Sequence, residues 1–345
     1  MRRKISAAVA AVCLTVLAAG ITSCRSGNKN PQKYDEGSTV MYCDEGFQSF
    51  MEEEIGVFEY QYPKAQVLVR YMSETDAINS MINDSCKLIV TSTPLTDQQK
   101  RYIKNHNKHV VSQSPIAVDA VALIVNKNNS LERLNTSDLR DILTGKIRNW
   151  SQLMRVNDNG LDTTQIKVVF DRMGSATVNF IQQKFLNGGN FMPNAFAQAT
   201  SMEVFKVVEN DPSAIGIISV SWLGEDLDVA SSDQVKANMN EDAMKSLENE
   251  QEIVTQKDFS DKIKVLAMGG DDAVLAKDFY LPYQEYIYDR EKYPLVRIIY
   301  LTSAAGQGTV GKTFYDFVTG FVGQKILTRT GVLPYKVAPR VVELQ

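Results

Sequence analysis

Residues 166–187 read IKVVFDRMGSATVNFIQQKFLN, an apolar run followed by a short polar turn and an amphipathic stretch. The run 166–170 predicts a buried strand, because it is short, apolar and rich in β-branched residues. Val178, Ile181 and Phe185 recur at helical spacing, which predicts a helix directly after the turn. A strand, a turn and a helix in this order are typical of α/β proteins.

The turn 171–177 places polar groups where the predicted helix begins. The first backbone N–H groups of a helix lack partners within it and point outward with the positive end of its dipole. Gly174 permits a tight turn, and Ser175 and Thr177 add hydroxyl donors. We therefore predict an anion site at Gly174, Ser175, Ala176 and Thr177. Ordinary helix capping without a ligand uses the same residue types and remains an alternative.

Further strand and helix signals alternate along the chain. Strands are expected at 40–42, 67–69, 88–90, 114–126, 166–170, 215–220, 263–268 and 293–301. Helices are expected at 47–62, after caps at Ser73 and Thr96, at 137–144 behind Thr136, from 175, at 202–208 and at 314–327. This alternation predicts mainly parallel sheets with helices on both faces.

The length of the chain predicts two lobes, because one core rarely organises so many residues. We expect lobe 1 at 38–117 and 261–345, lobe 2 at 118–222, and a polar surface excursion at 223–260. Such a chain leaves one α/β unit, builds a second and returns, so we expect hinges near 116–119 and 219–223. Ligands of such proteins bind in the cleft, at strand C-termini and helix N-termini.

The N-terminus predicts export. A basic start and an apolar run at 5–20 indicate a secretory signal over residues 1–23. The small residues before Cys24 resemble the lipoprotein processing signal, which implies a lipid-bearing Cys24 as the first mature residue. An ordinary signal peptide with an incidental cysteine is the alternative. Residues 24–37 are polar and predict a flexible tether. We expect the protein at the cell envelope, anchored to the membrane and facing the periplasm or the exterior.

The composition of the body limits its partners. Loss of Arg2, Arg3 and Lys4 with the signal changes the net charge from −4 to −7, which gives no electrostatic reason to bind nucleic acid. No other apolar segment is long enough to span a membrane. Cys43 and Cys86 are expected at opposite ends of parallel strands and therefore unpaired.

Longer strings in the chain resemble a known family. They are YMSETDAINSM, TSTPLT, SPIAVDAVALIVNKNN (114–129), LRDILTGKIRNWSQL (139–153), DPSAIGIISVSWL (211–223) and KYPLVRIIYL (292–301). In this order they are similar to the phosphate-binding proteins of bacterial phosphate ABC transporters, from about 38 to 334. The resemblance implies a monomer with the type II periplasmic-binding-protein fold, which holds an oxyanion between its lobes for permease subunits. Trp150 is expected to pack in the core.

The resemblance also implies ligand contacts from both lobes. The second-lobe loop, usually Arg-Ser-Asp-Gly-Ser-Gly-Thr in the family, falls on 171–177, where Asp171 holds the arginine position and Arg172 follows it. The positions that agree with the family are Gly174, Ser175 and Thr177.

The first-lobe loops of the family fall on three short segments of this chain. The loop that usually reads Gly-Ser-Thr falls on Cys-Asp-Glu here, which places Asp44 and Glu45 at the ligand. The second loop falls on Ser73 and Glu74, and the third on Ser92.

The departures from the family all add negative charge at the expected ligand site. Asp44, Glu45, Glu74 and Asp171 are carboxylates where the family has donors, and ionised carboxylates donate no hydrogen bonds. Two like charges about 4 Å apart repel by roughly 4 kcal/mol at an effective dielectric constant near 20. Three interpretations follow. Arg172 replaces the missing cation while the carboxylates turn away, a neutral or cationic solute binds, or the cleft serves a partner instead of a solute.

We therefore predict a solute-binding protein for phosphate or a related oxyanion; the alternative is an envelope sensor or assembly component. No enzymatic activity is expected, because Ser175 would need a base and the histidines, His106 and His109, lie in a polar run. No metal-ligand spacing is apparent, although the first-lobe carboxylates could chelate a hard cation. Exposed carboxylates at helix starts are the commoner case, and no cofactor or metal is predicted.

Overall fold

The computed structural model describes residues 34–153, 164–223, 229–249, 261–289 and 292–336. The predicted signal segment, Cys24 and most of the predicted tether lie outside these residues. Among the described residues, no helix is long and apolar enough to cross a membrane. The first strand already begins at Glu36, inside the segment predicted as a tether.

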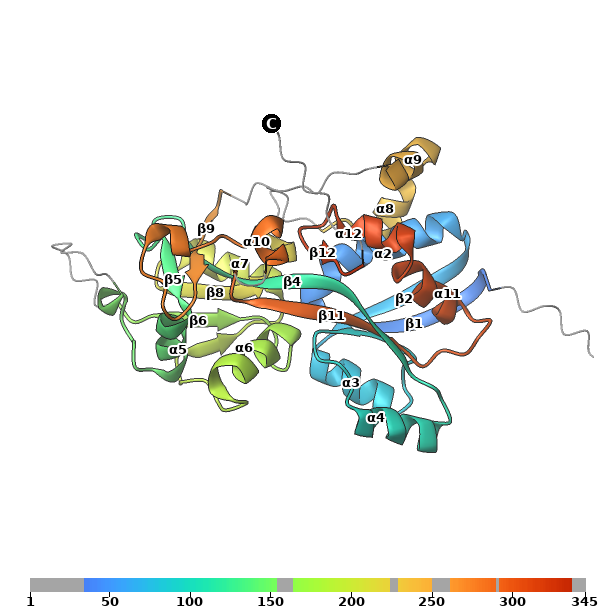
Figure 1. The fold of residues 1–345 in the computed structure, drawn as a ribbon, viewed down its shortest axis with the longest axis horizontal. Helices are drawn as coiled ribbons and strands as arrows, with labels where there is room; N and C mark the ends of the chain where they lie inside the picture. The colour runs from blue at the N-terminus through green and yellow to red at the C-terminus, as the bar shows by residue number, and fades with distance from the viewer. Residues whose placement is uncertain (1–33, 154–163, 224–228, 250–260, 290–291, 337–345) are drawn as a thin grey trace, which may run out of the picture. The chain divides into compact units, whose positions relative to one another are not determined.

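A ten-stranded sheet carries the fold, in the order β2-β1-β3-β11-β4-β8-β6-β7 with β9 and β12 paired to β4 (Figure 1). Its strands are β1 (Glu36–Asp44), β2 (Lys64–Met72), β3 (Leu88–Thr91), β4 (Ser112–Asn126), β6 (Lys167–Phe170), β7 (Ala195–Ala197), β8 (Ala214–Ser219), β9 (Ile263–Val265), β11 (Val296–Ser303) and β12 (Leu333–Pro334). β1 is parallel to β2 and β3, and β6 is parallel to β7 and β8. β4 and β11 are antiparallel to their neighbours, so each lobe mixes the parallel pairing that we expected with antiparallel strands.

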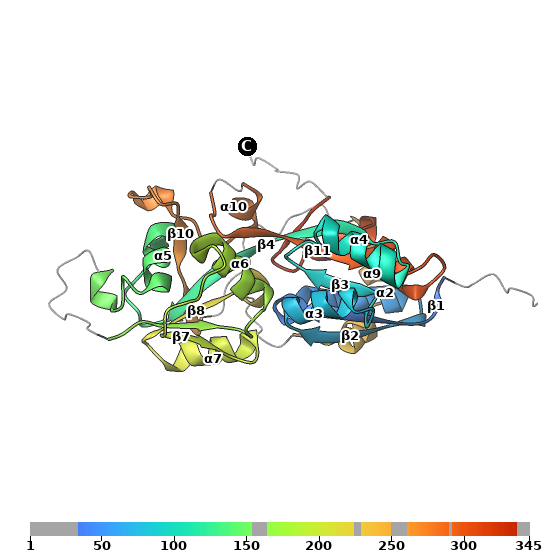
Figure 2. The same ribbon diagram turned by 90° about the horizontal axis from the view of Figure 1, so that it is seen from below.

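Two antiparallel strands join the lobes. The first half of β4 pairs with β11, and the second half pairs with β8. In Figure 1, β4 and β11 run from the group with β1, β2 and α2 to the group with β6, β8 and α7. Figure 2 shows the same division from below, with α3 beside β2 and β3 and α7 beside β7 and β8. The two groups of elements are the lobes of a type II periplasmic-binding-protein fold.

Helices cover both parts of the sheet. They are α2 (Gln48–Gln61), α3 (Glu74–Ile82), α4 (Asp97–Tyr102), α5 (Thr136–Thr144), α6 (Ala176–Leu186), α7 (Ser201–Asn210), α10 (Gln284–Tyr288), α11 (Val310–Val318) and α12 (Phe321–Leu327). The caps predicted at Ser73 and Thr96 are confirmed, since each side chain accepts a bond from the third residue of its helix. The cap predicted at Thr136 is wrong by one residue, because Asn135 accepts the amide of Asp138.

Two predicted elements are divided in the structure. The expected helix 314–327 is α11 and α12, because the chain turns at Thr319 and Gly320, and Phe321 is 59% exposed instead of sharing the buried face. The expected strand 263–268 is β9, which pairs with β4, and β10 (Ala267–Gly269), which pairs with β5 (Arg133–Asn135). The division of the strand depends on long-range pairing that a local pattern does not contain.

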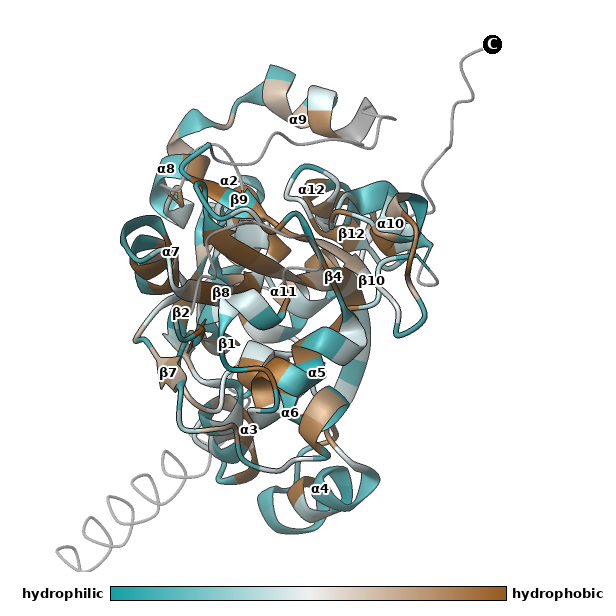
Figure 3. Ribbon diagram, turned by 90° about the vertical axis from the view of Figure 1, so that its left-hand side faces the viewer, coloured by the Kyte–Doolittle hydropathy of each residue, from teal (hydrophilic) through white to brown (hydrophobic). Residues whose placement is uncertain are grey.

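The core follows the apolar strands. β8 is buried along its whole length, and β4 from Ile116 onward. Figure 3, coloured by hydropathy, shows brown ribbon in the part of the molecule with β4 and β8, whereas α4, at the bottom of the view, is mostly teal. Trp150 is 1% exposed and donates to the carbonyl of Ser213, which confirms its expected core position. Cys43 and Cys86 are buried free thiols, as predicted.

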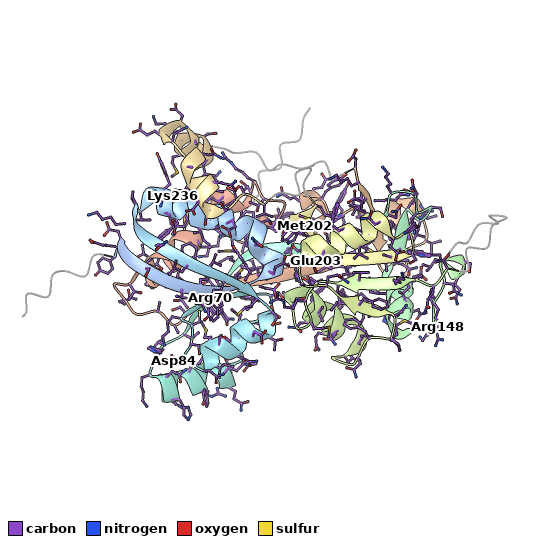
Figure 4. The ribbon with its side chains drawn as sticks, turned by 180° about the vertical axis from the view of Figure 1, so that it is seen from behind. Arg70, Asp84, Arg148, Met202, Glu203 and Lys236 are labelled. Carbon is purple, nitrogen blue, oxygen red and sulfur yellow. The ribbon has the colours of Figure 1, made fainter. Side chains whose placement is uncertain are left out.

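The polar segment after lobe 2 is helical where the structure describes it. It contains α8 (Ser232–Asn238) and α9 (Glu241–Asn249). α8 packs on α2, where Glu52 accepts the Ser232 amide at 2.6 Å and Lys236 lies 3.3 Å from Glu59 (Figure 4).

Candidate functional site

Asp44 ends β1 and is fully buried where the two lobes meet. Its Oδ1 accepts the Gly46 amide at 3.0 Å. Its Oδ2 accepts the Glu74 amide at 2.8 Å and the Ala176 amide at 2.9 Å. Because Glu74 opens α3 and Ala176 opens α6, one carboxylate oxygen binds a helix N-terminus from each lobe. A carboxylate is itself an anion, and the positive ends of both helix dipoles stabilise it.

This contact corrects the prediction of free amides at the start of α6. The Ala176 amide is bonded to Asp44, and the Val178 amide is bonded to Ser175 Oγ at 3.1 Å. The local string could not reveal this, because the acceptor lies 132 residues away in the sequence. The first-lobe carboxylates were expected to be exposed, and this expectation is also wrong, since Asp44, Glu45 and Glu74 are at most 7% exposed.

The Glu74 carboxylate accepts hydrogen bonds from the loop after β3. Its carboxylate accepts the Ser92 amide at 2.5 Å, Ser92 Oγ at 2.9 Å, the Thr93 amide at 3.0 Å and Thr93 Oγ1 at 2.7 Å. Asn179 of α6 donates to the same carboxylate at 3.1 Å. The donors that the resemblance assigned to a ligand at Ser92 are therefore bonded to the chain's own glutamate.

Glu45 makes a third contact of the same kind. Both of its carboxylate oxygens lie 3.1 Å from the Ser201 amide, and Oε2 accepts Ser201 Oγ at 2.8 Å. Ser201 begins α7, whose next residues, Met202 and Glu203, are labelled in Figure 4. Three helix starts and one strand end thus bind internal carboxylates at this interface.

Asp171 begins the loop after β6 and is 1% exposed. Ser175 Oγ donates to its Oδ1, while its Oδ2 is buried and has no hydrogen-bond partner within the described residues. Burial raises the pKa of Asp171 to about 7, against the opposing effects of the Ser175 bond, the Arg297 charge and the Thr177 hydroxyl. Arg172 is exposed and donates to the Ala199 carbonyl at 3.4 Å. In this conformation Arg172 is therefore not the substitute cation among these amides.

Arg297 is a site residue that the sequence analysis missed. Its Nε donates to Asp119 Oδ2 at 2.8 Å, and its Nη2 lies 2.7 Å from the same oxygen. Nη1 reaches Thr177 Oγ1 at 3.4 Å, and the guanidinium lies 4.9 Å from the centre of the Phe47 ring. Asp119 is the one charged residue of β4 and Arg297 the one charged residue of β11, which was the available signal for this pair.

Gly174 forms a direct backbone contact between the lobes. Its carbonyl accepts the Thr75 amide and Thr75 Oγ1, both at 3.1 Å. The φ angle of Gly174 is +75°, and a Cβ added there would lie 3.1 Å from Thr75 Oγ1. Ser73 is engaged nearby as the cap of α3, where it accepts the Asp76 amide at 3.1 Å. Glycine at 174 therefore permits close approach of the lobes as well as the turn.

Burial governs the electrostatics of the other carboxyl groups. Burial, together with the charges of Asp171 and Glu74, raises the pKa of Asp44 well above its ordinary value. Burial also raises the pKa of Glu45, and it raises that of Asp119 although Arg297 opposes the shift.

The described residues offer no catalytic arrangement at this interface. Ser175 Oγ bonds a carboxylate and a backbone amide, and neither histidine is near it. His106 stacks on Tyr102, and His109 lies against Lys87 and Asp84. Among the described residues, no group of three or more His, Cys, Asp or Glu side chains is placed to hold a metal ion. What the arrangement does is bind negative charge, and that charge comes from the protein itself.

The fold and this interface define a binding protein of the two-lobed class. A family model described as the PBP superfamily domain matches residues 35–320, so the chain belongs to this superfamily. A phosphate-binding protein of Streptococcus agalactiae serotype V is 27% identical over 123 residues, which cover 36% of this chain and 40% of that protein. One of Bacillus subtilis is 30% identical over 111 residues, covering 32% of this chain and 35% of that protein. The chain thus matches about a third to two fifths of these relatives' length.

Solved structures agree on the fold. A Clostridium perfringens structure assigned as a phosphate ABC transporter substrate-binding protein, with bound phosphate, has a TM-score of 0.63 and 21% identity. The match covers 87% of this chain and 100% of that chain. The resemblance to periplasmic phosphate-binding proteins is therefore confirmed.

Proposed function

We propose that this chain is a lipid-anchored extracytoplasmic protein of the phosphate-binding type in which internal carboxylates occupy the oxyanion position. In this role it presents a closed conformation to an envelope partner and does not carry free phosphate. The observation that supports the proposal is the Asp44 carboxylate, which binds the amides of Glu74 and Ala176 at once.

Energetics favour this reading over phosphate capture. A phosphate at the same amides would leave the Asp44 carboxylate beside it, and like charges about 4 Å apart repel by roughly 4 kcal/mol. That repulsion lowers affinity by about a thousandfold. Arg297 does not offset it, because its guanidinium already pairs with Asp119.

Isothermal titration calorimetry with phosphate tests the proposal. We expect no heat from the wild type at millimolar phosphate. Asp44→Ser should release the amides and create measurable binding, more strongly with Glu74→Ser added. Asp97→Asn, at an exposed carboxylate in the first turn of α4, is the control and should behave like the wild type. Micromolar binding of phosphate, sulfate or molybdate by the wild type would reject the proposal, and a panel of cations in the same titration tests a cationic solute.

The second candidate is capture of phosphate or a related oxyanion by an opened form, for delivery to the permease subunits of an ABC transporter. The donors themselves favour it, since the amides of Ala176, Ser92 and Thr93 converge on anionic oxygens. Wild-type binding in the titration would support this candidate. The anchor is tested separately: Cys24→Ala should release the protein from the membrane fraction.

A further inference from the structure

We propose that Asp44 and Asp171 together bind one proton when the lobes are closed, and that loss of this proton opens the lobes. The proposal rests on the proposed function, because it takes the internal carboxylates as the groups that hold the lobes together.

The two carboxylates come from different lobes and border one small space at the interface. Asp44 ends β1 in lobe 1, and Asp171 follows β6 in lobe 2. A methyl group placed on Gly46 would lie 3.0 Å from Asp44 Oδ1 and 3.8 Å from Asp171 Oδ2, so both oxygens border the same small space. Asp171 Oδ2 is buried without a hydrogen bond of normal geometry, although the Thr177 hydroxyl acts on this carboxyl group and favours its ionised form. An ionised oxygen in this position would be buried and poorly satisfied, whereas a protonated carboxyl group is neutral and gains a donor.

The surroundings of the pair are rich in negative charge. The charged groups that act on the two carboxylates are Glu45, Glu74 and Arg297. Arg297 is the only lysine or arginine among the described residues that is buried. It already forms an ion pair with Asp119, to which its Nε donates a hydrogen bond and from which its Nη2 lies 2.7 Å away. Arg172 is exposed, and its charge acts on Glu45. The buried carboxylates therefore outnumber the buried cations, which favours retention of a proton.

The direction of the pKa shifts of the two groups agrees with this geometry. Burial raises the pKa of Asp171 to about 7, and burial together with Asp171 and Glu74 raises that of Asp44. Two interacting carboxyl groups lose their protons as a pair, so the shared proton belongs to both. In an open form, where water reaches both groups, their pKa values return to about 4.

The sign of the effect follows from these values. Between about pH 4 and pH 7 the closed form binds more protons than the open form, so a rise in pH through this window favours opening. The ratio of closed to open protein should fall by on the order of a hundredfold between pH 5 and pH 8. Above about pH 7 the closed form has also lost the proton, and the ratio should level off.

Small-angle X-ray scattering at pH 5 and pH 8, at equal ionic strength, tests the proposal. We expect a larger radius of gyration at pH 8 for the ligand-free wild type. Asp171→Asn removes one of the two titrating groups and should expand less than the wild type between the two pH values. Asp97→Asn is the matched control and should expand like the wild type. Identical wild-type curves, or an Asp171→Asn protein that expands as the wild type does, would overturn the proposal.

Hydrogen exchange in the wild type tests it without a variant, should Asp171→Asn fail to fold. The Ala176 amide is bonded to Asp44 only while the lobes are closed. Its exchange, corrected for the intrinsic pH dependence, should accelerate between pH 5 and pH 8, and an unchanged corrected rate would overturn the proposal.

Phosphate calorimetry keeps the two proposals distinguishable. Phosphate binding rejects the proposed function whatever the pH dependence, whereas a pH-independent closed form without phosphate binding rejects only this inference.

Discussion

At the scale of single residues, Asp44 shows how a protein can supply its own ligand. Its carboxylate accepts three backbone amides from two lobes, and hydrogen bonds to charged groups contribute about 1.5–3 kcal/mol each. These bonds offset the cost of burying the charge, which would otherwise be several kcal/mol. Under the proposed function, the side chain that opposes phosphate binding therefore also binds the two lobes to each other.

Gly174→Ala should destabilise the protein more than a matched glycine substitution. Gly174 and Gly188 both have positive φ angles, +75° and +79°, so alanine costs roughly 1–2 kcal/mol at either position. Only at Gly174 would the new Cβ crowd Thr75, at 3.1 Å from Oγ1 and 3.3 Å from Cβ, which adds about 1–3 kcal/mol. Urea unfolding of the two variants measures the difference, and equal costs would contradict a close interlobe contact at Gly174.

Arg297→Met should lower the free energy of unfolding by about 3–5 kcal/mol, because it leaves Asp119 buried without its partner. Adding Asp119→Asn should recover part of the loss, since the unpaired charge is then removed. Chemical denaturation of the two single variants and the double variant measures the coupling. Strictly additive costs would show that the pair does not interact as the geometry requires.

At the scale of elements, α8 docks on α2 through a closely packed glycine. A Cβ added at Gly56 would lie 2.5 Å from Val235 Cβ and 2.7 Å from the Ser232 carbonyl oxygen. Such contacts require one helix to move away from the other. The segment predicted as a surface excursion is therefore also a packing partner of lobe 1.

Gly56→Ala should displace α8, although alanine favours a helix over glycine by up to about 1 kcal/mol. We expect a net destabilisation of about 1–3 kcal/mol from the overpacked contact. Faster hydrogen exchange in 232–238 would report the displacement. Gly270→Ala, at a position with no atom within 4 Å of the added Cβ, should leave that exchange unchanged. Unaltered protection of α8 in Gly56→Ala would contradict the close packing.

Most elements could be predicted from local pattern, and their errors have a common cause. The helices after Ser73 and Thr96 were placed correctly, because a capping side chain and an apolar spacing lie within a few residues of each other. The helix expected at 314–327 is divided, because the chain turns at Thr319 and Gly320. Gly323 then packs against the end of α11, where a Cβ would lie 2.5 Å from Val318 Cα. That contact depends on the turn between the helices, which the apolar spacing does not encode.

At the scale of the whole molecule, the stability of the protein should fall as pH rises from about 4 to 7. Burial raises the pKa of Asp171 from 3.8 to about 7, so the folded protein binds more protons than the unfolded chain in this window. The free energy of unfolding should decrease by up to about 1.4 kcal/mol per pH unit from this group. The raised pKa values of Glu45 and Asp119 act in the same direction.

Urea unfolding at pH 5, 6 and 7 measures this slope. Asp171→Asn should flatten it, and Asp97→Asn should leave it unchanged. A free energy of unfolding that rises over this range would mean that Asp171 is ionised in the folded protein.

The sequence by itself determined the two-lobed α/β class, most of the helix starts and the loops that form the candidate site. These features depend on periodicity, capping residues and family strings, all of which are local or ordered along the chain. Only the tertiary structure decided what those loops bind. Asp44 reaches an amide 132 residues away, and Glu45 one 156 residues away, so the partners of the helix starts became visible only once the lobes were in contact. The physical reason is that a carboxylate near a helix start can face water, a ligand or another helix, and only the folded chain decides which of these it meets.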